Sequence, residues 1–106
     1  MEVNTQTIAG QETRYKIREP GMYAVILLND EITTMDFVVM LLVKVFNKPP
    51  AEASALMMEI HHNGQGVAGI YTFDIAVTKK AQADRLTAEK GYPLRITIVA
   101  EGSNEA

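Results

Sequence analysis

The sequence contains no cysteine, which excludes disulfide bonds, thiolate metal sites and cysteine nucleophiles. No apolar run approaches the ~18 residues that a membrane-spanning helix needs. The formal net charge is -3 and the lysines and arginines form no cluster, so the chain lacks a patch suited to nucleic-acid phosphates. The first residues show no basic stretch followed by an apolar one, so we expect no secretory signal. These absences predict a soluble cytoplasmic protein that binds neither membranes nor nucleic acid.

The length and composition suit one domain. At 106 residues, with 47% of them hydrophobic, the chain can bury a single modest core. Residues 1–20 are polar, lack periodicity and end in a Pro-Gly turn, which predicts a flexible N-terminal arm. We therefore expect the core domain at residues 21–100 and a frayed C-terminus at residues 101–106.

Hydrophobic patterns within the core domain predict three strands and three helices. Short apolar, β-branched runs indicate strands, and apolar residues at helical spacing between turn or cap residues indicate helices. The predicted strands are 22–28, 67–73 and 92–99, and the predicted helices are 35–46, 50–63 and 74–90. The order β-α-α-β-α-β predicts an α+β fold, a two-layer sandwich with three helices on one face of a three-stranded antiparallel sheet.

Two short motifs invite functional readings that the surrounding pattern does not support. GQGVAG, at residues 64–69, has the spelling of a dinucleotide-binding loop, which requires a strand before it and a helix after it. Here the order is reversed, so we interpret the segment as a helix cap followed by a strand entry. His61 and His62 are adjacent helical residues that point about 100° apart and cannot chelate one ion. We predict no metal and no cofactor.

The stretch LLNDEITTMDF, at residues 27–37, is the most informative part of the chain. Turn chemistry alone explains Asn29 and Asp30 as a break after a strand, with Thr33 or Thr34 as the N-cap of the next helix. Met35 suits core packing and equally suits a surface that accepts varied apolar ligands. The neighbouring acceptors and apolar side chains leave open whether this segment binds something. The sequence contains no plausible pair of a nucleophile and a base, so we do not expect an enzyme.

Three blocks of sequence resemble the ClpS family, adaptors of the Clp protease. They are MYAVILLNDEITTMDFV at 22–38, ALMMEIHHNGQGVAGIYTFDIAVTKKAQ at 55–82 and YPLRITI at 92–98. The resemblance covers residues 22 to about 99. It implies a non-enzymatic adaptor for N-degron substrates, which it recognises by a free α-amino group and a bulky hydrophobic first residue (Leu, Phe, Tyr or Trp). The adaptor would then deliver these substrates to an AAA+ Clp unfoldase and its protease.

The resemblance also implies roles for individual residues. Asn29, Asp30 and His61 would bind the α-amino group. The hydrophobic pocket for the first side chain would be lined by Ile32, Thr33, Met35, Val38, Met57, Ile60 and Leu94. In the family the methionine that matches Met57 abuts the pocket and excludes β-branched side chains. Asp74 and Lys79 would contact the N-domain of a ClpA- or ClpC-type AAA+ unfoldase, and the arm at residues 1–20 would serve delivery.

The chain departs from the family pattern at Glu31, where aspartate is usual, and at Thr34, where proline is usual. A longer acid and a less rigid helix start would move the pocket rim. One alternative is therefore a divergent paralogue with shifted specificity. Another is a structural protein–protein interaction domain that keeps the fold without a peptide pocket. The joint presence of Asn29, Asp30 and His61 beside an apolar cavity would distinguish an adaptor from such a scaffold.

Overall fold

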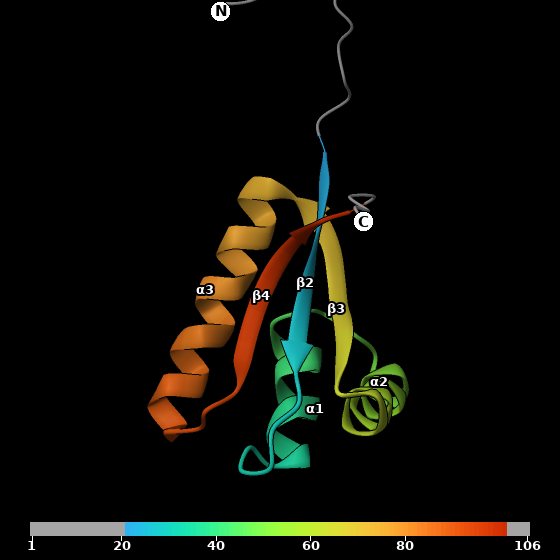
Figure 1. The fold of residues 1–106 in the computed structure, drawn as a ribbon, viewed down its shortest axis with the longest axis vertical. Helices are drawn as coiled ribbons and strands as arrows, with labels where there is room; N and C mark the ends of the chain where they lie inside the picture. The colour runs from blue at the N-terminus through green and yellow to red at the C-terminus, as the bar shows by residue number, and fades with distance from the viewer. Residues whose placement is uncertain (1–20, 102–106) are drawn as a thin grey trace, which may run out of the picture.

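The protein is described by a computed structural model that covers residues 21–101 (Figure 1). Its strands and helices follow one another as β2 (Met22–Leu28), α1 (Met35–Lys44), α2 (Pro50–Asn63), β3 (Gln65–Thr72), α3 (Phe73–Lys90) and β4 (Arg95–Ala100). The strand order is β3-β2-β4, and β2 pairs antiparallel with both neighbours. The predicted α+β class and element order are confirmed. The predicted arm, residues 1–20, and residues 102–106 lie outside the described part of the chain.

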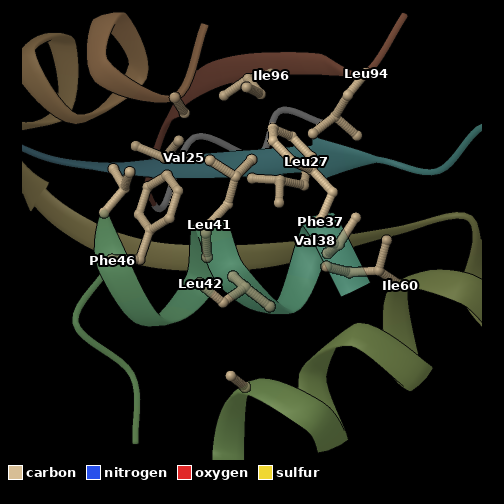
Figure 2. Close-up of a cluster of buried hydrophobic side chains, with 14 of the residues drawn as sticks. Val25, Leu27, Phe37, Val38, Leu41, Leu42, Phe46, Ile60, Leu94 and Ile96 are labelled. Atoms are coloured by element: carbon tan, nitrogen blue, oxygen red, sulfur yellow. The ribbon is translucent and has the colours of Figure 1, made fainter. Parts of the chain in front are cut away.

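The core lies between one face of the sheet and the three helices. Val25 and Leu27 of β2 are fully buried, because alternate residues of a strand point to the same face. Leu27 pairs with Ile96 of β4, whose side chain joins the same cluster. Figure 2 shows the side chains of Val25 and Leu27 beside Leu41 of α1. Buried residues of α2 and α3 complete this core, so all three helices cover one face, as predicted.

Helix α1 is buried on two sides, because it packs against both the sheet and α2 (Figure 2). Its N-cap is Thr34, whose hydroxyl accepts a hydrogen bond from the Phe37 N–H at 3.1 Å. The other cap candidate, Thr33, instead donates hydrogen bonds from its N–H and hydroxyl to Asp30 in the loop before the helix. The helix ends at Lys44, and the chain then turns through Asn47, which has a left-handed φ of 58°.

The segment between α2 and β3 confirms the cap-and-strand interpretation of the glycine motif. Gly64 is the C-cap of α2 with φ of 91°, a conformation that favours glycine. Gly66 is the second residue of β3 and pairs with Leu27 of β2. A Cβ added at Gly66 would lie 2.7 Å from Cγ1 of Ile60, so glycine lets the strand approach α2 closely. No helix within residues 21–101 is both long and apolar enough to cross a membrane.

Candidate functional site

A cavity of about 440 Å³ opens where β2 ends, between the loop at residues 29–34, α1 and α2. Its lining consists of Asn29, Asp30, Glu31, Ile32, Thr33, Thr34, Met35, Val38, Met57, Ile60 and His61. The cavity therefore gathers all three residues predicted to bind an amine and six of the seven predicted for the apolar pocket. Its volume lies in the range of sites for small ligands.

The loop that forms one wall is organised around the carboxylate of Asp30. Oδ1 accepts hydrogen bonds from the N–H groups of Ile32 at 2.8 Å and Thr33 at 2.7 Å. Oδ2 accepts a third from the Thr33 hydroxyl at 2.8 Å. An aspartate that binds the backbone two and three residues ahead stabilises a tight turn. Asp30 thus fixes the positions of the neighbouring side chains at the cavity mouth.

These contacts also decide the charge state of Asp30. Burial raises the pKa of its carboxyl, but the hydrogen bonds from Thr33 and Ile32 stabilise the charged form more, so the pKa lies below its ordinary value of 3.8. Asp30 is therefore ionised at neutral pH. The cavity wall carries a fixed negative charge close to its mouth, and no lysine or arginine among residues 21–101 lines the cavity.

The mouth is completed by residues from two distant parts of the chain. The Asn29 N–H donates to the Gly64 carbonyl at 2.9 Å, which ties the end of β2 to the C-terminus of α2. His61 lies in the last turn of α2, so this hydrogen bond brings the loop and His61 to the same opening. Both Asn29 and His61 are exposed and line the cavity. A carbonyl oxygen and an imidazole nitrogen are thus available as acceptors there.

The apolar side chains that line the cavity are buried at its base and exposed at its mouth. Val38 of α1 and Ile60 of α2 are buried at its base, and Met57 is half-buried against the core. Ile32 and Met35 are 65% and 42% exposed. The cavity can therefore take an apolar side chain against its buried base while a polar group stays at the opening.

Leu94 is the one predicted pocket residue that does not line this cavity in the described part of the chain, so its assignment stays a prediction. It is 7% exposed and belongs to the core just before β4. It also borders a separate hollow between α3 and β4, together with Lys80 and Asp84.

Two lining residues, Glu31 and Thr34, were not predicted as site residues and depart from the family pattern. The Glu31 side chain is exposed and makes no hydrogen bond or ion pair within residues 21–101. It therefore adds an anion at the mouth that is free of contacts in the described chain. Both residues line the cavity because the turn around Asp30 places the whole loop at residues 29–34 along the opening.

The two residues predicted to contact an unfoldase lie on α3 and do not line the cavity. Asp74 is exposed in the first turn of that helix. The Lys79 ammonium donates to the Val45 carbonyl at 2.6 Å and to Oδ1 of Asn47 at 2.7 Å. Lys79 therefore joins α3 to the end of α1, a structural contact that the sequence did not predict.

Comparison with known proteins identifies the family. The sequence profile described as ATP-dependent Clp protease adaptor protein ClpS matches residues 18–97. The chain belongs to the ClpS family. It is 44% identical to the ATP-dependent Clp protease adapter protein ClpS of Acetivibrio thermocellus, over 93% of this chain and all of that protein. It is 52% identical to the ClpS of Syntrophus aciditrophicus, over 78% of each chain.

A solved structure supports the same conclusion. Agrobacterium tumefaciens ClpS2 bound to L-phenylalaninamide is 37% identical, with a TM-score of 0.75, over 78% of this chain and all of that one. The ClpS fold and the role of adaptor of the Clp protease are therefore shown for this chain. The predicted family is confirmed.

The close contact between Gly66 and Ile60 gives a test of how the cavity floor is built. Gly66→Ala places a methyl group 2.7 Å from Cγ1 of Ile60 and forces that side chain toward the cavity. We expect the free energy of unfolding to fall by about 1–3 kcal/mol, as for other overpacked sites. Denaturant titration measures this loss. Gly21→Ala is the matched control, since within residues 21–101 its Cβ would meet only the Tyr23 side chain, at 3.8 Å. Equal stability of both variants would contradict the prediction.

Proposed function

We propose that this ClpS protein is an N-degron adaptor that binds a free α-amino group and a bulky hydrophobic first residue in the cavity beside α1 and α2. The observation that carries the proposal is the composition of the cavity. Acceptors and anions surround its mouth, while Val38 and Ile60 form an apolar base. A first residue of a protein presents the complementary pair, a cationic amine and an apolar side chain on the same Cα.

The mouth suits an α-amino group in number and type of acceptor. Such an amine is largely protonated at neutral pH and has three donors. Asn29 offers its amide oxygen and His61 a ring nitrogen when neutral. Asp30 already accepts three hydrogen bonds from its own loop, so we assign it mainly a charge and a positioning role. Glu31 has free acceptor oxygens for the amine or the residue next to it.

Neither half of the ligand accounts for tight binding by itself. Full burial of a Leu or Phe side chain contributes roughly 1.5–3 kcal/mol. Micromolar affinity corresponds to about -8 kcal/mol, so the amine contacts must supply much of the remainder. The amide bound to the Agrobacterium ClpS2 supports this division, because L-phenylalaninamide carries a free amine beside an aromatic side chain.

The test is a scan of the first residue. Peptides that differ only at residue one, over all twenty amino acids, are titrated against the full chain by fluorescence anisotropy. We expect Leu, Phe, Tyr and Trp to bind at least tenfold more tightly than polar or charged residues. Uniform affinity across the series would support a structural interaction domain without a peptide pocket. A shifted ranking, with one apolar residue preferred, would indicate the paralogue with altered specificity that Glu31 and Thr34 suggest.

The position of the two methionines predicts which of them excludes β-branched first residues. The extra methyl of Ile or Val is on Cβ, next to the Cα that carries the amine, so it lies at the mouth. Met35 is 42% exposed there, whereas Met57 is half-buried against the core. We therefore expect Met35→Ala to improve binding of an Ile-initiated peptide about tenfold, and Met57→Ala to improve it less.

Met58 provides the control for this comparison, because it is 39% exposed on α2 and does not line the cavity. Met58→Ala should leave every peptide affinity unchanged. A gain for Ile restricted to Met57→Ala would restore the assignment implied by the family resemblance. No gain in either variant would mean that neither methionine limits access at Cβ.

For the partner, we propose the N-domain of a ClpA- or ClpC-type AAA+ unfoldase, bound through the surface around Asp74 and Lys79. Both residues lie away from the cavity lining, so one molecule can hold a substrate and an unfoldase together. We also propose that residues 1–20 take part in delivery. This segment lies outside the described residues, so its role rests on the family resemblance alone.

A further inference from the structure

A second groove, of about 290 Å³, lies on the other flank of α1, next to the turn between α3 and β4. Its lining consists of Thr34, Asp36, Phe37, Met40, Lys90 and Tyr92. Thr34 also lines the cavity described above, so the two hollows meet at the first turn of α1. The proposed function uses only the first of them.

The groove has an apolar floor that is held in place. The rings of Phe37 and Tyr92 meet edge to face with centroids 5.0 Å apart, and Met40 is half-buried beside them. The Tyr92 N–H donates to the Thr87 carbonyl at 3.1 Å, which fixes Tyr92 to the end of α3. An apolar floor of this kind favours an apolar or aromatic side chain.

The rim of the groove carries one charge of each sign. Asp36 and Lys90 are both exposed, and neither side chain makes a hydrogen bond or an ion pair within residues 21–101. Opposite charges on the two sides give little preference for the charge of a ligand. The floor, and not the rim, therefore sets the selectivity.

The geometry of α1 gives the distance between the two hollows. Successive helical residues turn by 100°, so Met35 and Val38 face the cavity while Asp36 and Met40 face the opposite flank. A helix with its side chains is about 10–12 Å wide, and an extended chain advances about 3.3 Å per residue. About three residues thus separate a side chain in the cavity from one in the groove.

We propose that this groove is an extension subsite for the substrate chain, and that it binds an apolar or aromatic side chain at about the fourth to sixth residue of the N-degron protein. The inference rests on the proposed function, since the first residue must occupy the cavity. The shared residue Thr34 makes the groove continuous with that site. The adaptor then recognises a short N-terminal segment of its substrate and not the first residue alone.

The test uses the full chain and peptides that begin with Leu and continue with alanines and a distal fluorophore. Phe is moved through positions three to seven, and each affinity is measured by anisotropy. We expect about fivefold tighter binding with Phe at one of positions four to six. Met40→Ala should remove this gain, while Met58→Ala, outside both hollows, should keep it. Binding of the dipeptide Leu-Ala-amide should be the same in all three proteins, which also reports correct folding of the variants.

The outcomes separate the two proposals. If no Leu-initiated peptide binds the unmodified chain, the proposed function fails and the subsite fails with it. If Leu-Ala-amide binds but Phe has no effect at any position, or its gain persists in Met40→Ala, the subsite alone is refuted. A photoreactive phenylalanine at the best position gives an independent readout, because it should crosslink to the segment that contains Met40 or to the one that contains Tyr92.

Discussion

Removing the α-amino group from a Leu-initiated peptide is expected to abolish its binding, with a loss of affinity of about 1000-fold. The amine would lie among Asn29, His61 and the anions of the loop. Hydrogen bonds to a charged group contribute about 1.5–3 kcal/mol each, so losing two or three of them costs about 4 kcal/mol or more. At about 1.4 kcal/mol per tenfold change, this gives the expected factor.

Two modified peptides separate charge from bulk. N-acetyl-leucine removes the charge and adds atoms at the mouth, whereas 4-methylpentanoyl at position one removes the amine and adds nothing. Both should lose binding in anisotropy titrations, and the second should do so without any steric conflict. Equal affinity of the free and the deaminated peptide would exclude the amine contact. Loss with the acetylated peptide alone would mean that the mouth is narrow but does not recognise the cation.

A pair of variants at Asp30 tests how that recognition is built. Asp30→Asn keeps an oxygen for the N–H groups of Ile32 and Thr33 but removes the charge, whereas Asp30→Ala removes both. If Asp30 mainly shapes the loop, the alanine variant should bind the free peptide much more weakly than the asparagine variant. If it contacts the amine as an anion, the two should be similarly weak. Asp84→Ala, in the ion pair with Lys80 on α3, is the control outside the cavity.

Much of the fold could be predicted because local chemistry and packing agree. The apolar run of β2 ends where Asn29 begins a turn, and Gly64 ends α2, so both boundaries follow from single residues. The bounds of β3 and β4 differ from the predicted ranges 67–73 and 92–99, because backbone hydrogen bonding sets where a strand begins. β3 begins at Gln65, before its apolar residues, because backbone pairing extends past the side-chain pattern. β4 begins only at Arg95, after Pro93, which has no N–H to donate.

The candidate site shows where prediction from sequence stops. Residues close together in the loop were assigned to one site, and the structure brings them together with His61. Leu94 lies in the core cluster just before β4 and does not line the cavity in the described part of the chain, so its pocket role stays a prediction. The inward hydrogen bonds of Asp30 and the contacts of Lys79 with the end of α1 were missed. Side-chain partners of this kind depend on three-dimensional geometry that spacing along the chain does not contain.

Delivery should fail completely in a protein that still binds its substrate. Deleting residues 2–18 is expected to leave the affinity for a Leu-initiated peptide within about twofold, because the cavity lining lies between Asn29 and His61. The same deletion should abolish degradation of a Leu-initiated reporter by a ClpA- or ClpC-type unfoldase with its peptidase. If the truncated adaptor delivers the reporter as fast as the full chain, residues 2–18 play no part and tethering alone is sufficient.

Docking to the unfoldase requires a different variant, and the contacts of Lys79 decide which one. Replacing Lys79 removes its hydrogen bonds to Val45 and Asn47, so a loss of delivery could come from a destabilised fold. Asp74 is the cleaner choice, because its exposed side chain makes no hydrogen bond or ion pair within residues 21–101. Asp74→Lys should block delivery by weakening the complex with the unfoldase N-domain, measured by titration of that domain. Peptide affinity should not change.

Glu89→Lys makes the same change of charge near the other end of α3, at an exposed position, and is the matched control. It should bind the N-domain and deliver the reporter as the unmodified chain does. If both variants weaken docking equally, net charge and not a local contact drives the association, and raising the salt concentration should weaken the unmodified complex to the same extent. If Asp74→Lys docks and delivers normally, the unfoldase surface lies elsewhere on the protein, and the role that the family resemblance assigns to α3 is wrong for this chain.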